Sequence, residues 1–206
     1  MDAPVRLAEV RFMPERLPQL LRADAQDNRD RIVVAARALF SEAGLDVGMR
    51  EIARRAEVGP ATLYRRFPTR HLLVEEVFAE EVSSCRRIVE EGCANPDPWA
   101  GFCSVIEGVS LLNVSNRGFV DAFIAAGPDL EFITAHRIAL LRMIGDLAER
   151  AKAAGHLRSD FHVDDFVLVV RAERGLAGAP SASRDAAARR FAQLVIDGFR
   201  AAPTRT

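Results

Sequence analysis

Apolar side chains recur at helical spacing along most of the chain, and the strict alternation typical of strands is absent. The clearest stripe begins at Ile32 and continues through Ala35, Ala36, Leu39 and Phe40, with charged and polar residues on the opposite face. Similar stripes return up to the C-terminal end. The pattern therefore predicts an all-α fold of about nine helices, over residues 28–43, 49–56, 58–67, 69–92, 98–114, 116–126, 129–153, 163–177 and 185–201.

Glycines, prolines and capping residues mark the ends of these helices. Gly44 follows the first apolar stripe as a stop signal, and Gly59-Pro60 is a helix start. Pro68 ends that helix, and Thr69 is placed to cap the next one. Asp27 and Asn28 are cap candidates for the first helix, and residues 1–27, with three prolines and weak periodicity, are expected to be an irregular arm. Residues 178–183 are expected to form a loop.

Two short helices joined by about three residues, over residues 49–67, have the dimensions of a helix-turn-helix. Small residues at the start of the second helix would let its backbone approach base edges, and Leu63 and Phe67 would anchor it from behind. Exposed donors would contact the phosphates or bases of double-stranded DNA. The candidate DNA-binding residues are Arg50, Gly59, Pro60, Ala61, Thr62, Tyr64, Arg65 and Arg70.

The same segment resembles a known family. Ile32-x-x-Ala35-Ala36-x-x-Leu39-Phe40, Ile52-Ala53-x-x-Ala56, Thr62-Leu63-Tyr64-x-x-Phe67 and Arg70-x-Leu72-Leu73 stand in the order found in the N-terminal domain of TetR-type transcriptional regulators. The resemblance implies an all-α homodimer with a DNA-binding domain at residues 28–75 and a ligand-binding and dimerisation domain at residues 76–206. It also implies base or backbone contacts by Arg50 and Thr62, and phosphate contacts by Tyr64 and Arg70.

Two positions depart from the family pattern. Glu57 occupies a turn position where the family often has glycine, so a residue with a side chain would adopt a left-handed conformation and bring a negative charge toward the DNA. Gly48 stands where the family often has threonine, which removes one side chain able to contact a phosphate. These departures are the only support for an alternative, a small-molecule-binding protein or enzyme with a vestigial DNA-binding head.

The remaining two thirds of the chain carry the residues expected to bind ligand and partner subunit. Aromatic and sulfur side chains on the helices of this region are the candidate pocket lining: Trp99, Phe102, Phe119, Phe123 and Met143. The last two helices are expected to form the homodimer interface, with apolar area from Val167, Val170, Leu176, Phe191, Leu194, Val195 and Phe199.

Composition and charge narrow the function further. The net charge is −1 over 206 residues, but residues 22–74 carry ten arginines against seven acids, whereas residues 75–130 carry three against ten. A locally basic segment beside an acidic one is typical of a polarised molecule. No apolar run is long enough for a transmembrane helix and no signal pattern opens the chain, so a cytoplasmic protein without membrane contact is expected.

Neither metal nor catalytic chemistry is indicated. Cys85, Cys93 and Cys103 are not spaced as paired metal ligands, and the four histidines form no ligand pattern. Buried apolar cysteines or a thiol-based redox sensor remain the two interpretations of these residues. With no enzyme motif and no cofactor expected, the sequence predicts a DNA-binding regulator. We expect a repressor released from a palindromic operator by an unknown small molecule.

Overall fold

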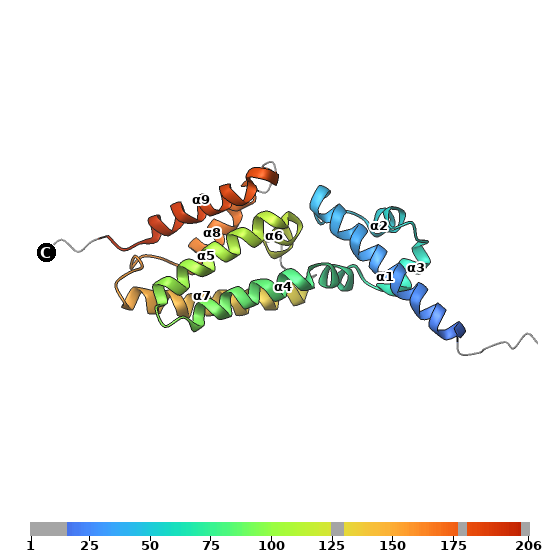
Figure 1. Cartoon of the computed structure of the whole chain (residues 1–206), viewed down its shortest axis with the longest axis horizontal. Coiled ribbons are helices and arrows are strands. Elements are labelled where there is room, and N and C mark those ends of the chain that lie inside the picture. Colours follow the sequence, from blue (N-terminus) through green and yellow to red (C-terminus); the bar gives the residue numbers. More distant parts are fainter. Residues whose placement is uncertain (1–15, 125–129, 177–180, 203–206) are drawn as a thin grey trace, which may run out of the picture.

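The computed structural model describes residues 16–124, 130–176 and 181–202, which form nine helices and no strand (Figure 1). The all-α prediction is therefore confirmed. The helices are α1 (Arg16–Ala43), α2 (Met49–Arg55), α3 (Pro60–Arg66), α4 (Arg70–Ala94), α5 (Pro98–Ser115), α6 (Arg117–Ile124), α7 (Glu131–Ala153), α8 (Val163–Glu173) and α9 (Ser181–Phe199). We call α1–α3 the head and α4–α9 the body.

The helix boundaries that Gly44, Gly59-Pro60 and Thr69 predict in and next to the head are present in the structure. Gly44 follows α1 with a φ of 79°, a left-handed conformation that costs glycine little. Gly59 is the N-cap of α3 and Pro60 is its first residue, while the Thr69 hydroxyl accepts a hydrogen bond from the Leu72 amide at 3.3 Å. These boundaries are set by local chemistry, which is why the sequence predicts them.

The first helix is longer than the sequence pattern indicates. α1 begins at Arg16, so residues 16–27 are helical rather than irregular, and Asp27 and Asn28 lie inside the helix instead of capping it. Only residues 1–15 of the expected arm fall outside the described residues. Among residues 24–43 the first buried one is Ile32, and the clear apolar stripe of the sequence begins only there. Leucine, arginine, glutamine and alanine, all good helix formers, favour the helix here, and Pro18 falls in its first turn, where proline is tolerated.

The end of the chain also differs in detail. α8 ends at Glu173 rather than near residue 177, and α9 begins at Ser181 rather than at residue 185. Residues 181–183 of the expected loop are therefore helical, while residues 177–180 lie outside the described residues, as do residues 125–129 around the predicted junction of α6 and α7. The α7–α8 connection pairs with the end of α9, where the Arg158 amide donates to the Phe199 carbonyl at 2.9 Å.

The head and the body are joined by α4, which runs from the head along the whole body (Figure 1). In the body, α4 packs most extensively against α5. At the turn between them, a Cβ on Gly101 would lie 2.2 Å from the Gly92 carbonyl oxygen, so the two backbones approach too closely for any side chain. None of the helices in the described parts of the chain is both long and apolar enough to cross a membrane.

Candidate DNA interface and body cavity

The helix-turn-helix is held from behind by four buried side chains. Ile52 and Ala53 of α2, Leu63 of α3 and Phe67 just after α3 are each at most 1% exposed and join the core with α1. The connection is closed by the Val58 amide, which donates to the Ala53 carbonyl at 3.0 Å. The core thus fixes α3 against the head while its other side faces the solvent.

The predicted contact residues lie on that open side. Gly59, Pro60 and Ala61 are exposed, as are Arg50 and Arg65, and Tyr64 is 49% exposed, so the only tyrosine is not a core residue. Thr62 is half-buried. The small residues leave the start of α3 open to close approach, and Tyr64 and Arg65 project hydrogen-bond donors from it.

Ion pairs separate the arginines of the head into two groups. Arg54 pairs with Glu51 at 3.3 Å and Arg55 pairs with Glu42 at 3.4 Å, so acids of the head partly neutralise their charges. Arg50 and Arg65 form no ion pair with any residue that the structure describes. Among the exposed arginines of α2 and α3, these two rather than Arg54 and Arg55 therefore offer positive charge to a polyanion, and the half-buried Arg66 forms no ion pair with a described residue either.

Arg70 lies apart from the other predicted contacts because its side chain turns into the head. Its guanidinium donates to the Val47 carbonyl and lies 5.5 Å from the centre of the Phe40 ring. Burial lowers the pKa of Arg70, because desolvation disfavours the charged form, while Asp46 acts in the opposite direction. In this position Arg70 fastens the start of α4 to the α1–α2 connection. The sequence pattern carries no signal for this contact, which joins residues 23 positions apart.

Glu57 adopts the left-handed conformation that its position predicts, with a φ of 54°. Arg31 of α1 donates to the Glu57 carbonyl at 3.1 Å and lies 3.4 Å from its carboxylate, so the turn is tied to α1. The Glu57 side chain is 86% exposed. The structure therefore explains how the turn tolerates a residue other than glycine, and it shows a cation beside the negative charge.

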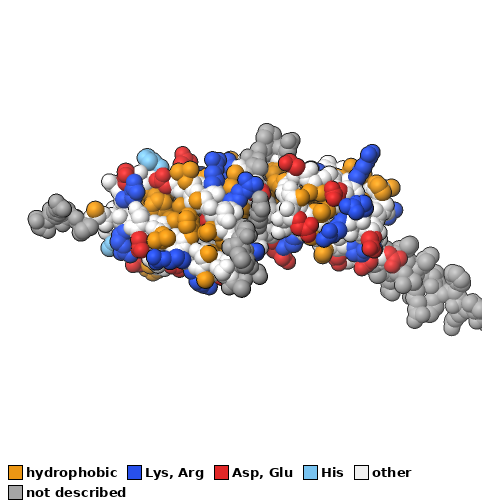
Figure 2. Space-filling view, turned by 90° about the horizontal axis from the view of Figure 1, so that it is seen from above, with side chains coloured by type: hydrophobic (Ala, Val, Ile, Leu, Met, Phe, Trp, Pro, Cys, Tyr) orange, Lys and Arg blue, Asp and Glu red, His pale blue; other side chains and the backbone are white. Residues whose placement is uncertain are grey.

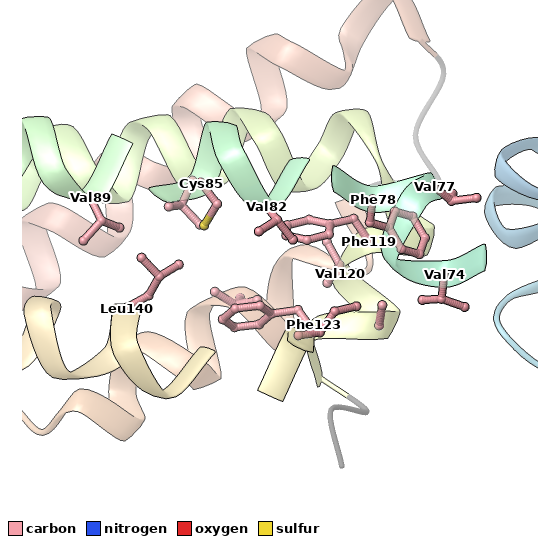
Figure 3. Close-up of a cluster of buried hydrophobic side chains, with 14 of the residues drawn as sticks. Val74, Val77, Phe78, Val82, Cys85, Val89, Phe119, Val120, Phe123 and Leu140 are labelled. Atoms are coloured by element: carbon pink, nitrogen blue, oxygen red, sulfur yellow. The ribbon is translucent and has the colours of Figure 1, made fainter. Parts of the chain in front are cut away.

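In the body, a narrow void lies among five helices. It has a volume of about 10 Å3, the room of a single water molecule. The side chains around it come from α4 to α8, and all but one are apolar: Cys85, Val89, Val109, Asn113, Phe119, Phe123, Leu140, Ile144, Phe166 and Val170. Figure 3 shows five of them, Cys85, Val89, Phe119, Phe123 and Leu140, within the buried hydrophobic cluster. Of the five predicted pocket residues, only Phe119 and Phe123 belong to it.

The other three predicted pocket residues have different places. Trp99 and Phe102 stack with ring centres 6.0 Å apart, and Phe102 meets Phe161 edge to face at 5.2 Å, so they form a closed aromatic cluster. Met143 is partly buried against the core, and its carbonyl accepts a hydrogen bond from Cys93. The two aromatic pairs are separated because Trp99 and Phe102 lie at the start of α5, whereas Phe119 and Phe123 lie on α6.

Two buried glutamates in the body escape the sequence analysis. Glu81 of α4 is 7% exposed and accepts hydrogen bonds from Arg37 and Asn116, each at 2.6 Å. Glu173 of α8 is 1% exposed and accepts from Ser110, and from Asn113 at 2.6 Å. The burial of Glu173 could have been predicted from its position, since it follows the buried Phe166 and Val170 at helical spacing on the inner face of α8.

The helix α6 connects the void with the head. Phe119 and Phe123 line the void, while a Cβ on the neighbouring Gly118 would lie 3.1 Å from the Phe40 carbonyl group of α1. At its far end, Arg137 of α7 donates to the carbonyls of Phe123 and Ile124. A displacement of α6 would therefore reach α1 directly.

The cysteines are separate thiols. Cys85 is buried, and Cys93 and Cys103 are half-buried. Burial raises the pKa of Cys85 to about 12 and that of Cys103 to about 11, so both are protonated at neutral pH.

Two family models match the sequence. The model described as bacterial regulatory proteins of the tetR family matches residues 32–77, and the model of the C-terminal domain of SbtR-like transcriptional regulators matches residues 97–201. The second match alone spans half of the chain. The chain belongs to the TetR family. It is a DNA-binding transcriptional regulator, as the resemblance of residues 28–75 implies.

Solved structures agree with this assignment. The TetR transcriptional regulator SCO0520 of Streptomyces coelicolor has 33% sequence identity and a TM-score of 0.50, over 86% of this chain and 99% of that chain. The ketosteroid transcriptional regulator KstR2 of Mycobacterium tuberculosis shares the fold at 19% identity and a TM-score of 0.64, over 84% of this chain and 95% of that chain. A gamma-butyrolactone receptor shares it at 18% identity and 0.57, over 85% of this chain and 99% of that chain. No curated protein matches the sequence significantly.

Proposed function

We propose that this TetR-family regulator is a repressor that binds a palindromic operator as a homodimer and leaves it when a small molecule binds in the body. The observation that carries the proposal is the exposed side of α3, where small residues, Tyr64 and the unpaired Arg65 stand on a closed core. The neighbouring Arg50 adds a second unpaired cation. Such a surface suits a major groove, where donors meet base edges and phosphates.

The individual roles follow from exposure. Gly59, Pro60 and Ala61 give the close approach, while Thr62 and Arg50 reach bases or the backbone. Tyr64 and Arg65 contact phosphates, as exposed donors at the end of a groove do. We assign Arg70 a positioning role, because its guanidinium is occupied by Val47 and Phe40.

The homodimer uses the face formed by α8 and α9. Leu168 and Leu194 are 60% and 53% exposed there, and an open groove of about 360 Å3 runs between the two helices. Figure 2 shows apolar side chains gathered over this part of the body, bordered by basic ones. The residues of the groove are Arg158, Asp165, Leu168, Val169, Ala172, Phe191, Val195, Gly198 and Phe199.

One member of the predicted interface does not belong to this face. Val170 is 2% exposed and lines the internal void, so it packs within its own subunit. Leu168, two positions earlier and on the opposite side of α8, takes its place.

Release from DNA would begin at α6. The void has room for about one water molecule, so a larger ligand must displace Phe119 or Phe123. Because Gly118 packs against Phe40, the displacement moves α1 and with it the head. Two recognition helices must sit about 34–36 Å apart to enter successive grooves. A ligand that favours another spacing would weaken DNA binding. Typical allosteric coupling energies correspond to a loss of about 5- to 150-fold in DNA affinity.

Selection from randomised duplex DNA tests the proposal. The purified full chain is incubated with the library at a fixed salt concentration, and the bound fraction is sequenced. We expect an enriched palindrome whose binding is lost in the double variant Arg50→Ala, Tyr64→Phe. The variant Arg54→Ala, which removes an arginine already paired with Glu51, is the matched control and should keep the selection. Weak, salt-sensitive binding without enrichment would overturn the proposal.

A further inference from the structure

The two buried glutamates of the body have similar surroundings but differ in one partner. Glu81 accepts hydrogen bonds from an asparagine and from the cationic Arg37. Glu173 accepts from Asn113 and from Ser110, which carries no charge. Where the first carboxylate has a guanidinium, the second has a hydroxyl.

The missing cation is not supplied by another described residue. The hydrogen-bond partners of Glu173 are Ser110 and Asn113, and it forms no ion pair with a described residue. Its neighbour Arg174 points elsewhere and pairs with Asp121 at 2.6 Å. Burial raises the pKa of Glu173, since an ionised carboxyl is disfavoured away from water unless a cation accompanies it.

Glu173 does not line the internal void itself but is one hydrogen bond away from it. Asn113 lines the void and donates to the Glu173 carboxylate, so one side chain touches both. Val170, one turn before Glu173 on α8, also lines the void. A polar group entering at Asn113 would meet the carboxylate by replacing the amide of Asn113.

The remainder of the lining is apolar. Nine of the ten lining residues are hydrophobic, three of them phenylalanines, and Asn113 is the only polar one. A molecule held here would therefore need an apolar, preferably aromatic body and a single polar end.

We propose that the ligand of this regulator is an apolar amine whose protonated nitrogen pairs with Glu173 while its body replaces or displaces Phe119 and Phe123. This inference rests on the proposed ligand response and names its chemical class. The ammonium supplies the cation that Arg37 supplies to Glu81. Ser110 remains as the hydrogen-bond partner that orients the carboxylate, while the ammonium takes the place of the Asn113 amide.

Matched probes test the amine directly. Binding of linear-alkyl, phenylalkyl and naphthylalkyl primary amines to the full chain is measured by calorimetry without DNA, beside the alcohols of the same carbon skeletons. A charge-assisted hydrogen bond predicts that the best amine binds about 10- to 100-fold more tightly than its alcohol. The preference should disappear in Glu173→Gln, which keeps the shape but not the charge. It should persist in Glu81→Gln, the matched control at the other buried glutamate.

Each contrary result overturns the inference. These results are failure of every amine to bind, equal binding of amine and alcohol, or an amine preference that survives Glu173→Gln.

If Glu173→Gln does not fold, the wild-type protein decides the question. The amine preference should then fall on acidification through the titration of Glu173, because the amine stays protonated while the carboxylate is lost. An unchanged preference would count against Glu173. Amine binding is measured without DNA, so it can succeed even if the operator selection fails, and the two proposals are tested separately.

Discussion

The head and the body differ in where they place unpaired charge: the head exposes it as cations, and the body buries it as a carboxylate. The head has a closed core of Ile52, Leu63 and Phe67 and leaves Arg50 and Arg65 unpaired on its surface. The body buries Glu173 without a cation, beside a void. A rigid surface with free cations suits a partner of fixed shape such as duplex DNA, whereas a buried carboxylate without a cation suits a small molecule that supplies one. The difference indicates that recognition of DNA is preformed and that the response to ligand is induced.

Phe67→Ala should have the largest effect, and it should be confined to the head. Removing a fully buried phenylalanine costs about 3–5 kcal/mol of unfolding free energy, because a cavity remains in a small core. DNA binding should be lost while sedimentation still detects the dimer. Phe161→Ala, an equally buried position in the body, is the matched control and should destabilise the body instead. Loss of the dimer in Phe67→Ala would show that the two regions do not fold separately.

Leu194→Asp should separate the subunits. A charge placed at an exposed apolar position of the α8–α9 face would be buried in the dimer, with a cost of about 2 kcal/mol or more in association. Analytical ultracentrifugation should detect monomers at concentrations where the wild type is dimeric. Ile138→Asp, at a 62% exposed isoleucine on α7, should remain dimeric. Equal behaviour of the two variants would remove α8 and α9 as the interface.

Glu173→Gln should change the pH dependence of stability. The pKa of this carboxyl is raised in the folded state, so folding is favoured where the group is protonated, and this contribution is lost as the pH rises through the folded pKa. The variant should therefore be more stable than the wild type at neutral pH and similar to it below the ordinary pKa of about 4.3. Urea denaturation over a series of pH values measures the difference. A constant difference would mean that Glu173 does not titrate in this range.

Glu57→Gly should have the smallest effect. Glycine relieves the left-handed conformation at a φ of 54°, worth about 1 kcal/mol, although loss of the Arg31 pair and a more flexible unfolded chain offset part of it. The negative charge near the DNA is removed as well, so operator affinity should rise slightly. Thermal melting and fluorescence anisotropy report the two effects. A variant less stable than the wild type would mean that Arg31 contributes more than the strain costs.

The sequence predicts what is local and misses what is tertiary. Gly44, Gly59-Pro60 and Thr69 define the helix ends of the head through their own backbone chemistry, so those elements follow from the pattern. The extension of α1 to Arg16 is missed because the clear apolar stripe of the sequence begins only at Ile32. The direction of Arg70 depends on a carbonyl 23 residues away, and the partners of Glu173 lie 60 or more positions earlier in the chain. No local pattern records such contacts.

The same distinction applies to the candidate sites. The exposure of Gly59, Pro60, Ala61, Tyr64 and Arg65 is predicted because Leu63 and Phe67 supply the buried face of the short helix α3 and leave the other residues on its outer face. The void cannot be predicted, since Phe119 and Phe123, which line it, and Trp99 and Phe102, which do not, all stand at helical spacing on their helices. Only the packing of α4 to α8 decides which aromatic side chains face the void.

The most direct measurement of the central claim, that the unpaired cations of the head bind DNA, is operator affinity as a function of salt concentration. Fluorescence anisotropy with the selected operator would compare the wild type, Arg50→Ala and Arg54→Ala. The account predicts that Arg50→Ala weakens binding and alters the salt slope by about one if Arg50 meets a phosphate, or weakens it by about 1–3 kcal/mol if Arg50 meets a base. Arg54→Ala should resemble the wild type. Equal losses in both variants would contradict the account, because the ion pairs would then not distinguish the arginines.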